Sequence, residues 1–358
     1  MSKKALIAMS GGVDSSVSAA LMCEKDYECI GVTMKLYEKE ETCETSDKAC
    51  CTLSDVEDAR NICHKLGMRF YVSNFKEDFS EQVIARFIKA YEIGATPNPC
   101  IDCNRYMKFE KLYHRAKEMS CDLIVTGHYA RVEKDENTGR YLLKKAKNIK
   151  KDQSYVLYFL SQEQLEHTLF PLGEYSDKEQ VREIAEKYGF INARKHDSQD
   201  ICFVPDGDYG SFIEEYANKK YPPGNFVDMD GKILGQHKGI IRYTIGQRKG
   251  LGLSLPAPMY VYDKNLEENT VILSSEKELF TSELIANNFN WIAYDKPNEP
   301  VRVAAKTRYN AKEAAAWAEV QKDGQVLVKF DEPQRAITKG QAVVLYDGDV
   351  VVGGGTII

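Results

Sequence analysis

A loop suited to phosphate binding lies close to the N-terminus. Residues 10–16 read Ser-Gly-Gly-Val-Asp-Ser-Ser, after an apolar segment and before a helix-compatible one. The adjacent glycines let the backbone approach a ligand closely, and the N–H groups and hydroxyls at a helix N-terminus can hold an anion. The loop lacks the lysine of a P-loop and the spaced glycines of a dinucleotide-binding motif. We therefore predict that backbone and hydroxyl groups bind a pyrophosphate, which leaves Asp14 to place Mg²⁺.

Cysteines supply a second set of reactive groups. Cys103 follows the Pro-rich residues 96–99 and precedes a helix expected at 105–117. The dipole of a helix lowers the pKa of a thiol near its N-terminus and favours the nucleophilic thiolate. Cys202 lies in an Ile-Cys-Phe run that resembles a short strand. Three further cysteines near a polar, acidic loop are interpreted as packing residues: Cys43, Cys50 and Cys51.

Basic residues cluster before residue 152, and a histidine follows a predicted strand. Residues 144–151 include five lysines, which form either a solvated hairpin or contacts with phosphate groups. His128 follows a buried strand expected at 122–126, at the sheet edge where ligands bind in open α/β folds. Its residue type alone leaves a structural and a functional role open.

Bulk composition is that of a globular enzyme. The chain has 358 residues, enough for two or three domains, with 43% hydrophobic and 28% charged residues. Its net charge of −6 argues weakly against nucleic-acid binding, but a net value hides the local basic cluster. No apolar run reaches membrane-spanning length, and residues 1–4 lead directly into a strand, so we expect no membrane segment, no cleavable signal and a cytoplasmic location. The ten cysteines are then expected to be reduced thiols or ligands and not a disulfide framework.

Alternating strands and helices predict an α/β fold for the first half of the chain. Apolar and helical patterns place strands at 5–9, 30–36, 69–73 and 122–126, and helices at 16–24, 54–66, 79–93 and 105–117. This order predicts a doubly wound parallel sheet. Capping boxes are predicted at Ser54-x-x-Glu57, Ser161-x-x-Gln164 and Ser176-x-x-Glu179.

The composition changes after Pro205. A helix at 209–218, followed by short strands punctuated with glycine, predicts a small, mainly-β central module. Further strands, with Asp-Gly turns between them, predict a C-terminal β-barrel at 301–309, 317–321, 325–330, 342–346 and 350–353. We divide the chain into a catalytic domain (1–205), a central module (206–278) and the β-barrel (279–358).

Several sequence strings occur in order along the whole chain: S-G-G-V-D-S-S (10–16), T-P-N-P (96–99) with Cys103-Asn104, G-H-Y (127–129), K-D-Q-S-Y (151–155), I-C-F (201–203), G-Q-R-K-G-L-G (246–252) and T-R-Y (307–309). In this combination the chain resembles bacterial tRNA-specific 2-thiouridylases, members of the ATP pyrophosphatase superfamily. The resemblance implies an N-terminal sheet of ATP-pyrophosphatase type and a central module that contacts tRNA.

The resemblance also implies a reaction. The family uses ATP, with Mg²⁺, to adenylate the C2 oxygen of the wobble uridine of certain tRNAs, and then replaces that oxygen with sulfur. Cys202 matches the cysteine that receives the sulfur as a persulfide, and Cys103 matches its partner thiol, with a Cys103–Cys202 disulfide after transfer. The implied partners are tRNA and a sulfur-donor protein, either a desulfurase or a persulfide carrier.

Binding residues follow from the same motif matches. The ATP-binding positions implied are Ala8, Met9, Ser10, Gly11, Gly12, Val13, Asp14, Ser15, Met34 and Gly127. The positions implied to touch the target base are Asn98, Pro99 and Cys100. The positions implied to touch tRNA are His128, Lys151, Asp152, Gln153, Arg308, Tyr309 and Gln341.

Cys100 departs from the family pattern, because many members have Asp at this position. With Cys103 and Cys202 it forms a set of three thiols, which could hold an iron–sulfur cluster with one iron open to an external sulfide. A tetrahedral zinc site would need a fourth ligand, and none is obvious. The sequence therefore leaves three alternatives: a persulfide relay, an iron–sulfur cluster, and a Cys100 without a role.

Two other functions compete with this interpretation. An ATP-pyrophosphatase ligase that uses ammonia would need the same loop but no cysteine pair. A non-catalytic RNA-binding protein would need no intact loop. Dependence of pyrophosphate release on tRNA or on ammonia separates the first from a thiouridylase, and ATP binding separates the second.

Overall fold

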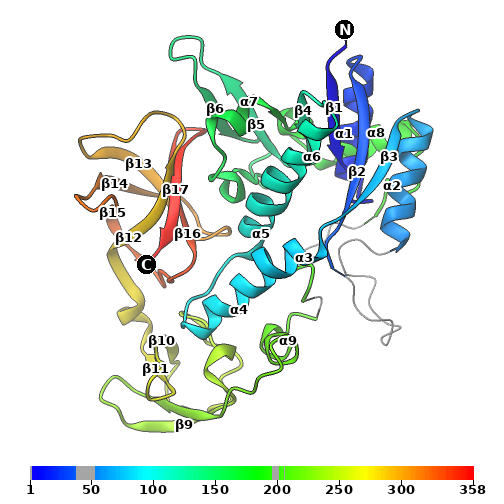
Figure 1. Ribbon diagram of the computed structural model, residues 1–358. Helices are drawn as coiled ribbons and strands as arrows, with labels where there is room; N and C mark the ends of the chain where they lie inside the picture. Colours follow the sequence, from blue (N-terminus) through cyan, green and yellow to red (C-terminus); the bar gives the residue numbers. More distant parts are fainter. Residues whose placement is uncertain (1, 38–52, 196–200, 205) are drawn as a thin grey trace.

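The computed structural model describes residues 2–37, 53–195, 201–204 and 206–358. The predicted acidic loop with Cys43, Cys50 and Cys51 lies outside these residues, as do residues 197–200 before Cys202. Figure 1 shows three parts: a parallel sheet covered by helices, a small middle module, and a C-terminal barrel.

A five-stranded parallel sheet forms the N-terminal part. Its strand order is β3-β2-β1-β4-β7, and each neighbouring pair is parallel. The strands are β1 (Lys4–Ala8), β2 (Glu28–Lys35), β3 (Arg69–Asn74), β4 (Leu123–Val125) and β7 (Thr168–Leu169). The order reverses direction between β1 and β4, and ligands bind at such a switch point in open α/β sheets. The predicted doubly wound sheet is confirmed, with β7 as an added edge strand.

Apolar cores cover both faces of this sheet, because successive side chains of a strand point to opposite faces. Ala5 and Ile7 pack in one core with α1 (Val13–Glu24), α2 (Leu53–Lys65) and α8 (Lys178–Lys187). Leu6 packs in the other core, against two continuous helices. The first helix is built from α3 (Lys76–Phe79), η1 (Ser80–Ile84) and α4 (Ala85–Glu92). The second is built from α5 (Pro99–Asp102), η2 (Cys103–Lys111) and α6 (Leu112–Glu118). Both η1 and η2 are π-helical.

The second of these helices begins six residues earlier than the sequence predicted, at Pro99 instead of residue 105. Asn98 is its N-cap, and its side chain accepts a hydrogen bond from the Cys100 N–H at 3.1 Å. A proline at the first helical position is tolerated because its missing N–H would have no helical partner there. Cys100 and Cys103 consequently lie within the helix and not in a loop before it.

Of the predicted capping boxes and the predicted strand at Cys202, only one capping box is confirmed. The capping box of Ser161 is confirmed at the start of α7 (Gln162–Glu166). The box predicted at Ser176 was wrong by one residue, because Asp177 caps α8 and pairs with Gln180. Ser54 lies inside the first turn of α2 and does not precede it. The short strand predicted around Cys202 was wrong, because a turn closes there with the Val204 N–H bonded to the Ile201 carbonyl at 2.8 Å.

The middle module combines one helix with a mixed sheet. It contains α9 (Tyr209–Tyr216) and a sheet of order β10-β11-β8-β9, in which β11 and β8 are parallel. The strands are β8 (Gly224–Val227), β9 (Ile233–His237), β10 (Tyr260–Asn265) and β11 (Thr270–Ser274). This agrees with the predicted small, mainly-β module. None of the helices described is long and apolar enough to cross a lipid bilayer.

An antiparallel barrel of six strands forms the C-terminal part. Its order is β12-β15-β14-β13-β16-β17, and pairing of β12 with β17 closes it. The strands are β12 (Phe280–Trp291), β13 (Val301–Lys306), β14 (Ala314–Val320), β15 (Val326–Arg335), β16 (Ala342–Asp347) and β17 (Val350–Ile357). The predicted barrel is confirmed, although β12 was missed. A hairpin of the N-terminal part, β5 (Ala130–Lys134) and β6 (Tyr141–Lys145), extends this sheet beside β17.

Candidate active site at the carboxyl edge of the parallel sheet

The phosphate-binding loop follows β1 and is shaped by one glycine. Gly11 has φ +73°, and a Cβ there would lie 2.5 Å from the Asp55 carbonyl oxygen, so no other residue fits without rearrangement. The Ser10 N–H donates to Ser15 Oγ at 3.2 Å, which closes the loop onto the first turn of α1. Gly12 is the N-cap, and none of the described side chains caps the helix there. The first N–H groups of α1 are therefore available to a phosphate.

Gly127 brings the end of β4 against this loop. A Cβ at Gly127 would lie 2.9 Å from the backbone nitrogen of Ser15. Met9 is fixed from the other side, where its N–H donates to the Val32 carbonyl at 2.9 Å. Met34, buried near the end of β2, lies at the same edge of the sheet. The structure thus brings together the positions predicted to bind ATP, from Ala8 to Ser15 with Met34 and Gly127.

Asp14 has partners that the sequence did not reveal. Lys178 Nζ lies 2.6 Å from Asp14 Oδ1, and the Tyr129 hydroxyl donates to the same oxygen at 2.8 Å. The Lys178 side chain is only 10% exposed, and its ammonium lies 5.5 Å from the centre of the Tyr129 ring. A cation at the first position of a helix opposes the helix dipole, so Lys178 directly after the cap Asp177 is the one local signal that could have identified it.

The Asn192 side chain forms hydrogen bonds with the phosphate-binding loop. Its Nδ2 donates to the Gly11 carbonyl at 2.8 Å and contacts Ser16 Oγ at 2.9 Å. Its Oδ1 is buried without a hydrogen-bond partner in the described structure. Two loop positions are therefore fixed by one amide, which no spacing rule in the sequence predicts.

The described side chains at this site determine which metal ions could bind. Among the residues described, no three Cys, His, Asp or Glu side chains are grouped as metal ligands. Asp14 still fits Mg²⁺, which commonly takes one or two carboxylates and completes its shell with phosphate oxygens and water. Among the described residues, Cys100, Cys103 and Cys202 are not grouped as metal ligands.

The segments that carry the two predicted catalytic cysteines pack on one helix. Cys103 and Cys202 are half-buried against the same apolar core. Phe203, next to Cys202, packs on the helix of residues 76–92, with ring centres 5.8 Å from Phe79 and 5.3 Å from Phe87. The π-helical segment that begins at Cys103 packs on the same helix.

Residues predicted to contact tRNA meet near Cys100, which is exposed. The Tyr309 hydroxyl donates to the Asp152 carbonyl at 3.2 Å. Burial, then the charge of Asp152 and then that of Cys100, raises the pKa of Tyr309. Gln153 Oε1 accepts a hydrogen bond from the Tyr129 N–H at 2.9 Å. Because Tyr129 also bonds Asp14, these contacts connect the phosphate loop to the surface around Cys100.

His128 and Gln341, two further positions predicted to touch tRNA, both make contacts within the protein. His128 is only 7% exposed, and its Nδ1 lies 2.7 Å from Thr126 Oγ1. Burial, and secondarily the charge of Lys108, holds the pKa of His128 well below its usual value, so the ring is neutral. Gln341 Nε2 donates to the Thr96 carbonyl at 2.8 Å and fastens the barrel to the segment before Asn98.

The basic segment is partly neutralised by its own protein. Ion pairs join Lys144 to Glu133 at 2.9 Å, Lys145 to Glu313 at 2.6 Å and Lys147 to Glu174 at 2.6 Å. Lys150 is exposed, as is Arg308 on the barrel. The hairpin interpretation thus accounts for three of the five lysines.

Comparisons with known proteins agree with the motifs. Family models match in succession: the tRNA methyl transferase HUP domain (residues 3–206), the tRNA methyl transferase PRC-barrel domain (210–275) and the aminomethyltransferase beta-barrel domain (281–357). The chain is 54% identical over 357 residues to the tRNA-specific 2-thiouridylase MnmA of Clostridioides difficile (strain 630), covering 100% of this chain and 98% of the relative. It is 55% identical to MnmA 1 of Thermoanaerobacter sp. (strain X514), covering 99% and 97%, and 53% identical to MnmA of Acetivibrio thermocellus, covering 99% of each. The family expected from the motifs is confirmed: the chain belongs to the tRNA-specific 2-thiouridylases.

Proposed function

We propose that this protein catalyses the ATP-dependent 2-thiolation of the wobble uridine of tRNA, giving 2-thiouridine, AMP and pyrophosphate. Its membership of the family supports this activity. The structural observation that carries it is the line of contacts from Asp14 through Tyr129 and Gln153 to the surface of Tyr309 and Cys100. This line connects a phosphate-binding loop with the helix that bears Cys100 and Cys103.

ATP supplies the leaving group. A uracil carbonyl is a weak electrophile, and its oxygen leaves only when it is converted to a better leaving group such as AMP. The first N–H groups of α1 would bind the phosphates, and Lys178 would add a positive charge beside them. Asp14 would supply one carboxylate ligand to a Mg²⁺ ion, which neutralises phosphate charge when bound.

Cys202 and Cys103 would carry the sulfur. The terminal sulfur of a Cys202 persulfide attacks C2 of the adenylated uridine, and AMP leaves with the former C2 oxygen. The Cys103 thiolate then attacks Sγ of Cys202, which breaks the S–S bond to the base and leaves the sulfur on C2. A Cys103–Cys202 disulfide results, and an external thiol reduces it. The lack of a grouped three-cysteine ligand set among the described residues favours this relay over an iron–sulfur cluster.

Recognition of tRNA would use all three proposed domains, 1–205, 206–278 and 279–358. Lys151, Arg308 and Tyr309 would contact the backbone, and residues 98–100 would contact the target base. The wobble base must leave the anticodon stack to reach a buried site, as in other base-modifying enzymes. A sulfur-donor protein, a desulfurase or a persulfide carrier, would deliver sulfur to Cys202.

Pyrophosphate release tests the reaction class. We expect release from ATP to require tRNA and to be insensitive to ammonia. Ammonia-dependent release without tRNA would instead indicate a ligase. Analysis of the tRNA nucleosides separates thiolation from the methylation that the family-model descriptions name, and a methylated uridine as the product would refute the proposal.

A further inference from the structure

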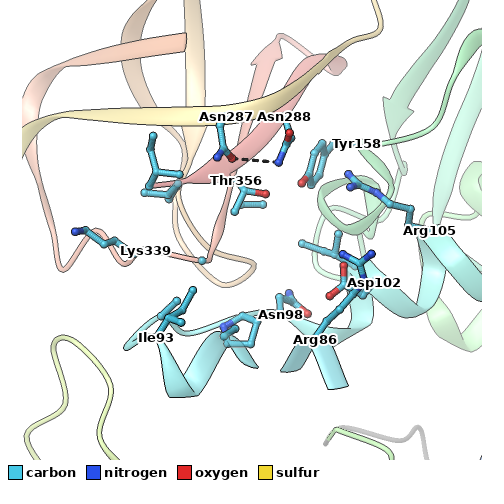
Figure 2. Close-up of a pocket in the computed structure, with 18 residues that line it drawn as sticks. Arg86, Ile93, Asn98, Asp102, Arg105, Tyr158, Asn287, Asn288, Lys339 and Thr356 are labelled. Carbon is cyan, nitrogen blue, oxygen red and sulfur yellow. Dashed lines mark hydrogen bonds between the residues drawn. The ribbon is translucent and has the colours of Figure 1, made fainter. Parts of the chain in front are cut away.

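A pocket with polar and apolar walls lies between the N-terminal part and the barrel. Its volume is about 500 Å³, and Figure 2 shows side chains from both parts directed into it. Arg86, Asp102 and Arg105 come from the two long helices, and Asn98 caps the second of them. Asn288 and Lys339 come from the barrel side. Neither Cys103 nor Cys202 lines it, whereas Asn98, which is predicted to touch the target base, does.

Asp102 is the distinctive group of this pocket. Its carboxylate lies beside the side chains of Arg86 and Arg105 (Figure 2), yet within the described part of the chain it has no hydrogen bond or ion pair. Burial raises the pKa of Asp102 to about 6, although Arg105 and Arg86 lower it. The carboxylate is partly exposed in the pocket, so a hydrogen-bond donor of a ligand can reach it.

The flanking arginines are held in place by aromatic rings. The Arg86 guanidinium lies 4.5 Å from the centre of the Tyr106 ring, and its Nε donates to Gln82 Oε1 at 3.2 Å. The Arg105 guanidinium lies 5.2 Å from the centre of the Phe159 ring. An acceptor therefore stands between two fixed groups that only donate hydrogen bonds.

This arrangement complements particular nucleobases. Uracil and guanine each present an imino N–H beside a carbonyl oxygen, whereas cytosine and adenine present a ring nitrogen that accepts. A carboxylate can bind the imino N–H while a guanidinium binds the carbonyl, but the carboxylate would repel an accepting ring nitrogen. The pocket volume suits such a ligand, and single-stranded RNA is commonly read by splayed bases that meet arginine and aromatic side chains.

We propose that this pocket binds a second unstacked nucleotide of the same tRNA, a uridine or guanosine, whose imino N–H donates to Asp102 and whose carbonyl accepts from Arg86 or Arg105. The inference rests on the proposed function and adds a specificity subsite to it. Because neither Cys103 nor Cys202 lines the pocket, we assign it to a base other than the one that is thiolated. Its role is to select tRNAs by a loop position other than the modified one.

A panel of RNA stem-loops tests this subsite. Each unpaired uridine or guanosine except the wobble position is replaced by cytidine, one at a time, and the Kd of each RNA is measured for the full-length protein. For the unaltered protein we expect one replacement to raise Kd about tenfold. For Asp102→Asn the same replacement should have little effect, because an amide can donate to the ring nitrogen of cytidine. Glu110→Gln, an exposed change on the same helix, is the matched control and should keep the discrimination.

The outcomes separate this inference from the proposed function. The subsite is refuted if no loop position discriminates, or if Asp102→Asn discriminates as strongly as the unaltered protein. Binding of free UMP or GMP in the pocket, with the same Kd for every stem-loop of the panel, would also overturn the assignment to tRNA. Arg105→Met provides a second variant, expected to weaken binding of the unaltered stem-loop and not of the cytidine-substituted one. Failure of thiolation with every stem-loop would refute the proposed function, while the Kd comparison would still decide the subsite.

Discussion

Lys178 Nζ lies 2.6 Å from Oδ1 of Asp14, so that helix α8 and the phosphate-binding loop share a partly buried ion pair. The pair places a positive charge beside a loop that has no lysine of its own. Bound phosphates would attract the same ammonium, and Asp14 would then be released towards Mg²⁺. We propose that Lys178 supplies, from a distant segment, the charge that a P-loop carries within its own motif.

Removing either partner should impair ATP cleavage. We expect Lys178→Met and Asp14→Asn each to lower tRNA-dependent pyrophosphate release by about ten- to a hundredfold, because a charge-assisted contact contributes about 1.5–3 kcal/mol. The double variant should lose less than the sum of both, because the two side chains act on each other. Lys187→Met, an exposed change on the same helix, is the control. Near-normal release by Lys178→Met would remove this lysine from the site.

The sequence predicted those parts of the site that depend on local chemistry. The loop of residues 10–16 and Gly127 were predicted because glycines at strand ends are signals that can be read within a few residues of sequence. Asn192 could not be predicted, and Lys178 had a single local signal, because the contacts of both arise only when α8 and the following segment pack against α1. The early helix start at Pro99 was missed because two prolines were interpreted as a loop, although proline is well suited to a first helical position.

In the barrel, too, the sequence predicted local features but not contacts between distant segments. Its later strands were predicted from Asp-Gly turns, which are local signals. β12 was missed, and so was the joining of hairpin β5–β6 to β17 through Val350 and Lys144. The burial of His128 follows from the rings of Phe109 and Phe170 around it, which come from different segments. Pairings between distant segments leave no short-range pattern.

Asp102 should make stability depend on pH. Its pKa is raised from 3.8 to about 6 in the folded protein, so folding favours the protonated form. The folded protein therefore loses stability as pH rises from about 4 to 6, and the loss is complete above that window. Asp102→Asn should raise the free energy of unfolding at pH 7.5 by up to about 3 kcal/mol, and by much less near pH 4. Urea unfolding at both values checks this, and an equal difference at both would show that Asp102 does not titrate as described.

Salt dependence should identify the lysines that contact tRNA. We expect Lys151→Ala and Arg308→Ala each to reduce the slope of log affinity against log salt by about 0.7–0.9, because each contact with phosphate releases counterions. Lys147→Ala should leave the slope nearly unchanged, because Lys147 is paired with Glu174 at 2.6 Å. Filter binding at several salt concentrations measures the slopes. Equal slopes for all three variants would indicate that the basic segment is a solvated surface without phosphate contacts.

The cysteines should differ sharply in their effects on product formation. We expect Cys103→Ser and Cys202→Ser to abolish thiolation, because each removes a sulfur needed for the relay. Pyrophosphate release should persist in both, because adenylation precedes sulfur attack. Cys100→Ser should retain substantial activity, because Cys100 is exposed and has no part in the relay. Loss of pyrophosphate release in Cys202→Ser would show instead that this residue acts before sulfur transfer.

Mass spectrometry of tRNA nucleosides is the most direct measurement of the central claim. Purified protein, analysed for iron after anaerobic preparation, is incubated with tRNA, ATP and a persulfide donor, in parallel with Cys100→Ser and Cys202→Ser. We predict 2-thiouridine at the wobble position from the iron-free unaltered protein and from Cys100→Ser, and none from Cys202→Ser. Absence of 2-thiouridine with the unaltered protein, or iron-dependent activity that disappears in Cys100→Ser, would contradict the account.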